Sequence, residues 1–234
     1  MFIFWLYGKW VFQVLNQVKI KGRENLPYRQ ADDGKKSLKT AQRTKILFVA
    51  NHLTLVDSWL LGISLINLKE FLFYGEVIPY NAPEFGNFLG SPLWRWLFKL
   101  SRTIPVERGG RDRQKMERVF AEYKAALEHG TLLLFLGGRR SKDGEVGECV
   151  SGVSETVLRY QPTVVPIWLE KNIQKIMPLS MGNKLGINFF LLRRGYRGLV
   201  KIGQPLEFNG SSRREEVGKK LAEAIIALKE PLSN

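Results

Sequence analysis

Histidine is scarce in this chain, and one of its two histidines stands where catalysis could use it. His52 follows an apolar run, Ile46–Ala50, and Asp57 comes five residues later. Five residues along a regular helix give a rotation of about 140°, so the two side chains can meet only if His52 precedes the helix. The capping-box pattern beginning at Thr54 indicates such a start. Asp57 could then hold the imidazole in one tautomer, and His52 could act as a general base toward a hydroxyl group.

Both residues also have a structural interpretation. Asp57 could simply cap the helix, and His52 could be a satisfied turn residue, since a His followed by an Asp at this spacing is common by chance. The second histidine, His129, stands near the end of a predicted helix, where a partly charged imidazole complements the helix dipole. The pair alone leaves catalysis and structure both open.

Two basic, glycine-containing loops also follow predicted strands. One covers residues 102–111 and the other residues 137–144. Arginine on such turns can bind phosphate oxygens bidentately, and glycine lets backbone N–H groups approach an anion. Solvated charged loops of this kind are common too. Because strand ends can converge at one edge of an open sheet, we expect both loops to lie near His52.

The elements that must position these residues alternate between short apolar strands and amphipathic helices. Strands are predicted within residues 18–26 and at residues 46–50, 71–74, 104–106, 131–135, 164–168 and 198–202, and helices at residues 54–68, 112–129, 154–159 and 212–228. The alternation predicts an α/β fold, with a central mixed sheet flanked by helices. The length of 234 residues fits one domain with a small appendage.

Composition narrows the classes of partner. The chain has 36 Lys and Arg against 22 Asp and Glu, a net charge of +14, and 12% aromatic residues. Such a surface attracts polyanions, which can be nucleic acid, an anionic membrane or acidic substrates and carriers. The single cysteine, Cys149, excludes an intrachain disulfide framework. Two histidines and one cysteine leave little room for a His/Cys metal site, and we expect neither a metal nor a bound cofactor.

The N-terminal segment favours a membrane over nucleic acid as the partner. Residues 1–18 are apolar and aromatic, with Lys9 as an interruption. Their length is at the lower limit for a bilayer-spanning helix. Their Trp and Tyr residues are typical of the headgroup boundary. We expect an interfacial or half-inserted helix, and an ordinary core helix is the alternative. Residues 88–100, with two Trp beside basic residues, are a second candidate for such contact.

Four segments together resemble the glycerolipid acyltransferase family, the group that includes the 1-acyl-glycerol-3-phosphate acyltransferases. They are residues 51–58, 104–108, 135–144 and 164–167, in this order, after a related stretch at residues 22–27. The resemblance implies direct transfer of a fatty acyl group from an acyl thioester, either acyl-CoA or acyl carrier protein, to the hydroxyl of a lysophospholipid-like acceptor. No Ser or Cys stands in a nucleophile elbow, in agreement with a reaction that has no acyl-enzyme.

The same resemblance implies roles for residues. His52 would be the general base and Asp57 its orienting partner. Arg108 and Arg140 would bind the phosphate of the acceptor or another anionic headgroup, and Pro166 would belong to the segment that shapes the acyl pocket. The substrate-binding residues that we expect are Arg108, Gly138, Arg139, Arg140, Ser141 and Pro166. Backbone N–H groups near the start of the helix would stabilise the oxyanion.

The composition along the chain and the resemblance together predict an organisation of the chain. We expect a membrane-anchoring segment at residues 1–27, a polar loop at residues 28–45 and the acyltransferase domain at residues 46–234. The enzyme would work on an anionic membrane surface, at the cytoplasmic face.

One departure concerns the third segment, where the family pattern is Phe-Pro-Glu-Gly-Thr-Arg-Ser. Leu136, Gly137 and Arg139 here replace the Pro, the Glu and the Thr. The family associates that Glu with acceptor binding, so either the acceptor differs from lysophosphatidate or the protein is a membrane-binding relative with weak or no activity. The intact His52–Asp57 pair favours an enzyme. A nucleic-acid-binding protein is a third interpretation, but no RNP-like, zinc-finger or helix-turn-helix signature is present, and we expect no nucleic-acid partner.

Overall fold

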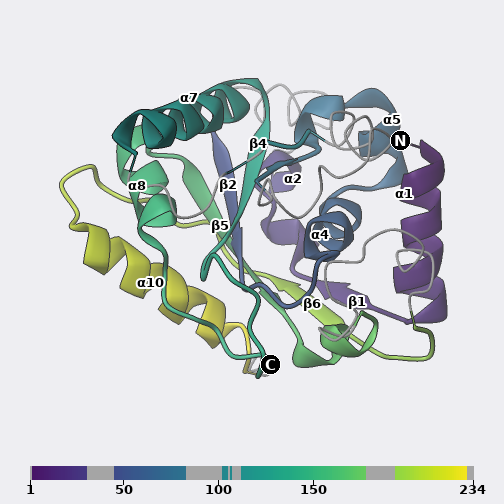
Figure 1. The fold of residues 1–234 in the computed structure, drawn as a ribbon. Coiled ribbons are helices and arrows are strands. Elements are labelled where there is room, and N and C mark those ends of the chain that lie inside the picture. The colour runs from purple at the N-terminus through teal and green to yellow at the C-terminus, as the bar shows by residue number, and fades with distance from the viewer. Residues whose placement is uncertain are drawn as a thin grey trace.

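A mixed β-sheet forms the centre of the protein (Figure 1). The computed structural model describes residues 2–30, 45–82, 102–104, 106, 112–177 and 193–230. Six strands within these residues pair in the order β1-β6-β5-β2-β4-β3. They are β1 (Lys19–Lys21), β2 (Ile46–Ala50), β3 (Tyr80–Asn81), β4 (Thr131–Phe135), β5 (Thr163–Leu169) and β6 (Leu199–Ile202). The β5–β6 pair is antiparallel and the other pairs are parallel, which confirms the predicted α/β fold with a mixed sheet.

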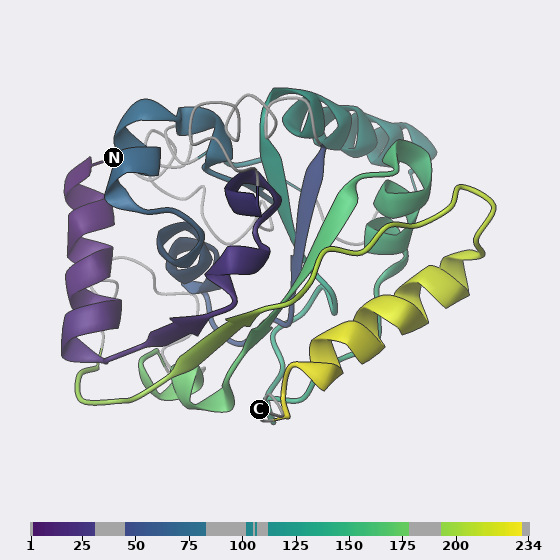
Figure 2. The ribbon, with the colours of Figure 1, turned by 180° about the vertical axis from the view of Figure 1, so that it is seen from behind.

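Helices cover both faces of the sheet (Figures 1 and 2). The α-helices are α1 (Phe2–Lys9), α2 (Pro27–Gln30), α4 (Asp57–Leu65), α5 (Leu68–Phe73), α7 (Arg113–His129), α8 (Ser151–Tyr160) and α10 (Arg214–Ala227). A π-helical stretch, η1 (Trp10–Leu15), continues α1, and short 3₁₀ turns are η2 (Arg23–Asn25), η3 (Gly75–Val77) and η5 (Lys171–Lys175). The α7, α8 and α10 helices cover one face, and α1, α4 and α5 cover the other.

The two faces correspond to two buried apolar clusters, because successive side chains of a strand point to opposite sides. On β2, Ile46 and Phe48 belong to the cluster beneath α1 and α4, whereas Leu47 and Val49 belong to the cluster beneath α7, α8 and α10. All five residues of β2 are buried. Such a continuous apolar run is typical of a parallel strand that is covered on both faces.

The strand predicted at residues 71–74 is wrong, because this stretch lies in and just after helix α5. Asn67 begins the helix with a reciprocal capping box: its side chain accepts a hydrogen bond from the backbone N–H of Glu70, and the Glu70 carboxylate accepts one from the backbone N–H of Asn67. Two otherwise unpaired N–H groups are satisfied in this way, which favours the helix over an extended strand.

Other boundaries differ more modestly. The helix expected over residues 54–68 begins at Asp57 and ends at Leu65. Next to the strand expected at residues 104–106, Thr103 forms an isolated bridge with Asn81, and β3 is an additional strand. Residue 105 lies outside the described residues. The first residues of the polar loop expected at residues 28–45 are helical instead, because α2 extends to Gln30. Residues 31–44 and 88–100 lie outside the described residues, so the rest of that loop and the second aromatic segment stay predictions.

The N-terminal segment shares the sheet and the core with the rest of the chain. Strand β1 pairs with β6, and Val18, Leu26 and Tyr28 are buried in the cluster that α4 also covers. Residues on both sides of the expected boundary after residue 27 thus share one buried cluster, and the expected division of the chain stays a prediction. None of the helices among the described residues is long and apolar enough to cross a membrane.

Candidate active site

The turn that follows β2 is attached to the strands on both sides of it. The Asn51 amide donates to the carbonyl of Leu169, at 2.9 Å, and accepts from its N–H, at 2.7 Å, at the end of β5. On the other side, the N–H of Leu136, just after β4, donates to the carbonyl of Ala50 at 2.9 Å. The backbone leaving β2 is thus fixed at the carboxyl edge of three parallel strands, where polar loops of α/β sheets converge.

This turn places His52 against Asp57, the first residue of α4. His52 Nδ1 lies 2.8 Å from Asp57 Oδ2. The same oxygen accepts the backbone N–H groups of Leu53, at 2.5 Å, and Thr54, at 2.8 Å, while Asp57 Oδ1 accepts the Thr54 hydroxyl at 2.5 Å. The Asp57 side chain is fully buried and lies at a helix N-terminus, where the helix dipole favours a negative charge.

These contacts decide which ring nitrogen of His52 carries hydrogen. Because Asp57 Oδ2 already accepts two backbone N–H groups, it serves as an acceptor, and His52 Nδ1 donates to it. Nε2 is then the nitrogen with a free lone pair. The imidazole stacks on Phe135, with ring centroids 4.0 Å apart and an angle of 14°, and only 15% of the side chain is exposed. The ring is therefore held in orientation and in tautomer.

The loop after β4 closes against His52. The N–H of Ser141 donates to the carbonyl of His52 at 2.7 Å, and the N–H of Gly138 donates to that of Phe135 at 3.3 Å. Gly138 has φ +60°, and a Cβ there would lie 2.9 Å from Cγ1 of Val150. A left-handed backbone in such close contact favours glycine. The structure thus confirms that the glycine- and arginine-containing loop lies beside the His52 turn.

The Ser141 side chain serves the loop itself. Its hydroxyl donates to Asp143 Oδ1 at 2.7 Å and accepts the N–H of Gly144 at 2.9 Å. The hydrogen bond from Ser141 is the main cause that lowers the pKa of the exposed Asp143 carboxyl. Gln174 donates to the carbonyl of Ser141 at 2.7 Å, so the loop is also tied to η5. These contacts give Ser141 an observed role in shaping the loop, and a substrate-binding role stays a prediction.

The described residues include two of the three arginines predicted to bind phosphate. Arg139 is exposed and Arg140 is partly buried, both in the loop that contacts His52. Arg140 takes part in an interaction within the protein. Arg108 lies outside the described residues. The phosphate-binding roles of Arg108, Arg139 and Arg140 stay predictions.

Pro166 lies on the other face of the sheet from the His52 ring. Its ring is against Gly203, where an added Cβ would lie 2.9 Å from Pro166 Cγ, and Leu228 is close to the same point. Leu228 packs against the cluster beneath α7, α8 and α10, whereas Phe135, which stacks on His52, packs against the opposite cluster. A role of Pro166 in an acyl pocket stays a prediction, without direct contact to the His52 side chain in this arrangement.

Most backbone N–H groups near the start of α4, which we expected to stabilise an oxyanion, already donate hydrogen bonds within the turn. The N–H groups of Leu53 and Thr54 donate to Asp57, and that of Val56 donates to the Thr54 hydroxyl at 3.2 Å. Three of the backbone donors nearest His52 thus make hydrogen bonds within the turn that holds His52 against Asp57. An oxyanion at this site needs other donors.

Three residues of the site were missed in the sequence. Thr54 carries a signal, because its capping pattern is visible, but the structure uses its hydroxyl on the Asp57 side chain. Asn51 has a partner 118 residues away, and no local pattern predicts that contact. Phe135, the last residue of β4, is identified as a support for His52 only when the strand order is known.

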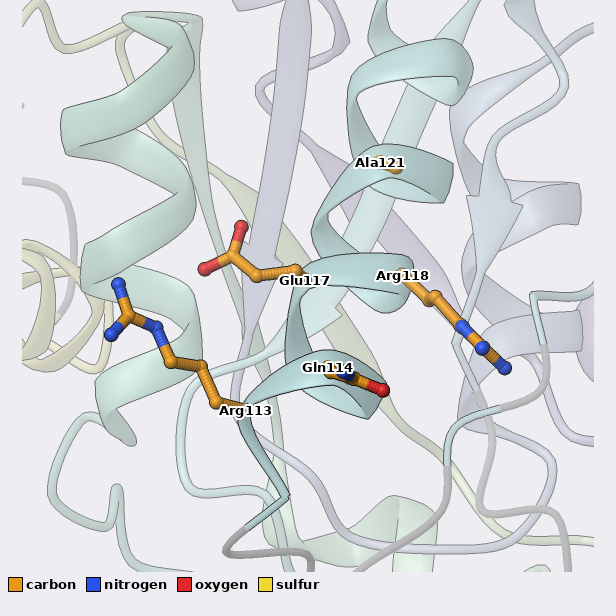
Figure 3. Close-up of a pocket in the computed structure, with 5 residues that line it drawn as sticks. All are labelled: Arg113, Gln114, Glu117, Arg118 and Ala121. Carbon is orange, nitrogen blue, oxygen red and sulfur yellow. The ribbon is translucent and has the colours of Figure 1, made fainter.

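A separate hollow of about 530 Å³ lies along the first half of α7 (Figure 3). Its lining residues are Arg113, Gln114, Glu117, Arg118 and Ala121. Figure 3 shows Arg113 and Glu117 extending to one side of the helix and Gln114 and Arg118 to the other. None of these residues belongs to the turn after β2 or to the loop after β4, so the hollow is not part of the His52 site.

Comparison with known proteins agrees with this geometry. A solved structure similar to this chain is that of the 1-acyl-sn-glycerophosphate (LPA) acyltransferase PlsC from Thermotoga maritima, with a TM-score of 0.62 and 18% identity over 99% of this chain and 80% of that chain. At this identity the likeness shows a common fold. No curated protein matches the chain in sequence. A family model described as Acyltransferase matches residues 17–170, which include the His52 turn and the loop after β4. The chain therefore belongs to the acyltransferase family.

Proposed function

We propose that the chain is a membrane-associated enzyme that transfers a fatty acyl group from an acyl thioester to the hydroxyl of a lysophospholipid-like acceptor. The observation that carries this proposal is the contact of His52 Nδ1 with the fully buried Asp57 carboxylate. That contact leaves Nε2 as a proton acceptor. The family supplies the reaction type, and the similar PlsC, a 1-acyl-sn-glycerophosphate acyltransferase, suggests the class of acceptor.

The proposed reaction needs one base and no covalent enzyme intermediate. His52 Nε2 accepts the proton of the acceptor hydroxyl as its oxygen attacks the thioester carbonyl carbon. Asp57 stabilises the imidazolium that forms, through the hydrogen bond to Nδ1. The C–S bond then breaks, the ester forms, and the thiolate takes up the proton from His52. Proton transfer of this kind contributes about 10²–10⁴-fold to the rate.

We place the anionic parts of the substrates at the loop after β4. Arg139 and Arg140 stand there beside the His52 turn, and Arg108 completes the proposed set. Acyl-CoA and acyl carrier protein are both anionic, so either donor suits a basic loop. At Gly137 an added Cβ would meet its nearest atom, the Arg139 carbonyl oxygen, at 3.7 Å. A side chain would fit there, and the absence of an acidic side chain leaves the loop more positive toward the acceptor.

The N-terminal helix supports the membrane part of the proposal. Ile3, Leu6, Trp10 and Val14 follow one another at helical spacing and are 80%, 44%, 48% and 63% exposed. The neighbouring α5 adds the exposed Leu68, Leu72 and Phe73, and we call these seven side chains the apolar face. Exposed apolar groups that include a Trp suit the interfacial layer of a bilayer. We place the enzyme there, at the cytoplasmic face.

An acyl-transfer assay tests the catalytic part. The protein is incubated with a panel of lysophospholipids and labelled acyl donors of both types, acyl-CoA and acyl carrier protein. We expect transfer to at least one acceptor, and a loss of about 10²–10⁴-fold in kcat for His52→Ala. His129→Ala is the matched control, because His129 is exposed at the end of α7, and it should keep the wild-type rate. Equal rates for His52→Ala and wild type would contradict the mechanism.

The replacement of Glu by Gly at position 137 favours one second candidate, a membrane-binding relative with weak or no transfer activity. The same assay separates the two. If no acceptor in the panel is acylated while the protein still floats with vesicles, the second candidate holds.

Vesicle flotation tests the membrane part. A Leu6→Glu/Trp10→Glu variant should bind vesicles about tenfold less than wild type, because two charged groups replace apolar surface at the proposed contact. Ile226→Glu is a matched control: Ile226 is 47% exposed and lies on α10, on the other side of the molecule from α1 (Figures 1 and 2). Equal losses for both variants would argue against the apolar face as the contact.

A further inference from the structure

A group of charged side chains gathers at the end of α4 that is farther from Asp57. Lys9 ends α1, Arg23 lies in η2, Arg29 in α2 and Glu70 in α5. We call these four the Lys9 cluster. It has three positive charges and one negative charge. Arg23 and Arg29 contact the last residues of α4, about 12 Å along the helix from Asp57. The proposed acyl transfer gives this cluster no role.

Part of the cluster has a structural explanation. Arg29 binds the Glu70 carboxylate with two hydrogen bonds, of 2.9 Å from Nε and 2.6 Å from Nη2. Arg23 Nε donates to the carbonyl of Ser64 at 2.9 Å, and the Tyr28 hydroxyl donates to that of Leu65 at 2.8 Å. These donors satisfy free carbonyls at the C-terminus of α4. The Glu70 carboxylate thus pairs with Arg29, and no ion pair of Lys9 or Arg23 is found among the described residues.

Two donors in this region are buried and lack an acceptor. Arg23 Nη2 and Trp5 Nε1 are two of the three buried side-chain nitrogen or oxygen atoms that have no hydrogen-bond partner in the described part of the chain. The Lys9 ammonium lies over the Trp5 ring, 4.9 Å from its centroid, and the described residues give it no carboxylate within ion-pair distance. Unsatisfied buried donors are costly, and each such group calls for an explanation.

Burial and mutual repulsion disfavour the charged forms of Lys9 and Arg23. Burial, followed by the positive charges of Arg23 and Arg29, lowers the pKa of Lys9 to about 8, against the opposing effect of Glu70. Burial and the charge of Arg29 also lower the pKa of Arg23. Cations that are partly withdrawn from water and repel one another are stabilised when an anion neutralises them.

We propose that Lys9 and Arg23 bind a phosphate group, as a phosphomonoester or phosphodiester, at a site distinct from the His52 site. Arg23 Nη2, which is buried and has no hydrogen-bond partner among the described residues, and the Lys9 ammonium are charge-assisted donors of the kind that phosphate oxygens accept. Helix α1, which carries Lys9, also carries part of the apolar face, and α1 lies beside α5 (Figures 1 and 2). A lipid headgroup or free phosphate can therefore supply the group, and the inference holds whether or not His52 catalyses acyl transfer.

Nuclear magnetic resonance of the full chain carrying ¹³Cε-labelled lysine tests the site with inorganic phosphate as the probe. Phosphate replaces chloride at constant ionic strength. The Lys9 signal should move saturably, and its titration midpoint should rise, while the signal of Lys21, exposed on β1, stays in place. Arg23→Gln should weaken the apparent Kd about tenfold, the effect of one charge-assisted bond. A Lys9 signal that responds no more than that of Lys21 overturns the proposal.

A second measurement covers the case in which Arg23→Gln does not fold. Phosphate should raise the melting temperature of the wild type and of Lys21→Gln equally, and that of Lys9→Gln clearly less. Equal phosphate-dependent shifts in all three proteins overturn the site, because phosphate then acts elsewhere.

Vesicles identify the source of the phosphate group. Flotation with vesicles of phosphatidylcholine and phosphatidylglycerol compares the same three proteins. An about fivefold loss for Lys9→Gln that exceeds the loss for Lys21→Gln supports a lipid phosphodiester as the ligand. Equal flotation of both variants, together with a retained phosphate response at Lys9, supports free phosphate. If neither probe separates Lys9→Gln from Lys21→Gln, the proposal fails.

Discussion

At the scale of single residues, the site depends on the carboxylate of Asp57 more than on any other group. Both of its oxygens are occupied, and one of them receives His52 as well as two backbone N–H groups. Asp57 therefore orients the imidazole and shapes the turn that carries it. A substitution around this carboxylate should affect catalysis and folding together, and suitable variants can separate the two.

Substitutions of Thr54 can separate the effect on catalysis from the effect on folding. Thr54→Val keeps the shape of the side chain but removes the hydroxyl that donates to Asp57 Oδ1. Loss of a hydrogen bond to a buried charged group should lower the free energy of unfolding by about 1–3 kcal/mol. We expect kcat to fall about tenfold with KM nearly unchanged, because the proposed base, His52, is less well oriented while substrate contacts remain.

Thr54→Ser is the control, since it restores the hydroxyl. Denaturant unfolding and steady-state kinetics are the measurements. If kcat of Thr54→Val equals that of Thr54→Ser after both proteins are shown to be folded, Thr54 has only a structural role.

Two neighbouring glycines in the loop after β4 should behave differently. Gly138 has φ +60° and a Cβ there would lie 2.9 Å from Val150, whereas a Cβ on Gly137 would meet its nearest atom at 3.7 Å. Gly138→Ala should therefore destabilise the protein by about 1–2 kcal/mol and lower kcat, since the loop hydrogen-bonds to His52. Gly137→Ala should leave stability within about 0.5 kcal/mol. Comparable destabilisation of both variants in thermal unfolding would show that the loop conformation is different.

At the scale of elements, prediction from sequence succeeded where a pattern was local. The apolar runs of β2, β4 and β5 were found, and their shared carboxyl edge follows from an α/β topology. The spacing of His52 and Asp57, with the helix starting after His52, also follows from local sequence. The contact of Asn51 with Leu169 could not be predicted, because it depends on which strand is the neighbour of β2.

The failure at α5 has an equally local cause. The four residues 71–74 are apolar and aromatic, which favours a strand, but Asn67 and Glu70 upstream form an N-terminal capping box. The capping residues lie outside the apolar run, so a prediction from the composition of the run alone does not take them into account. Glu70 is also bound by Arg29, a contact between segments that no local pattern shows.

That contact makes Glu70 a strong test of how α5 is held. Glu70→Ala removes the capping carboxylate and leaves Arg29 without its partner, so the free energy of unfolding should fall by about 2–3 kcal/mol, somewhat below the value for a fully buried pair because the Arg29 side chain is 22% exposed. Glu128→Ala breaks the exposed pair with Lys124 and should change stability by less than about 0.5 kcal/mol. Denaturant unfolding compares the two, and similar effects would mean that the Arg29 pair contributes little.

At the scale of the whole molecule, the basic side chains behind the net charge of +14 stand in different environments. Some basic side chains are paired at the surface, as Arg159 is with Glu117 and Glu155. Others stand in the loop beside His52, and Lys9 and Arg23 are partly buried behind the apolar face. A partly buried positive charge without a partner lowers the free energy of unfolding. If such a charge is kept for function, removing it should therefore raise the free energy of unfolding.

Lys9 allows this cost to be measured through its pH dependence. Its pKa in the folded protein is about 8, below the usual value of 10.5, with Arg23, Arg29 and Glu70 as the charged groups that act on it. Below pH 8 Lys9 is charged in both states, and its burial destabilises the fold. Between about pH 8 and pH 10.5 the unfolded chain binds the proton more tightly than the folded one, so this destabilisation disappears as the pH rises.

Lys9→Met should accordingly be more stable than wild type near pH 7 in a buffer free of phosphate. After allowance for solvent screening and for the lost contact with the Trp5 ring, the gain should be about 1 kcal/mol. The gain should shrink toward zero between pH 8 and pH 10, whereas Lys21→Met, which removes an exposed charge, should show a small and pH-independent difference. Urea unfolding at several pH values measures both. A Lys9→Met variant that is less stable than wild type at pH 7 would mean that the protein already balances this charge, and the case for a bound phosphate would then lose its energetic basis.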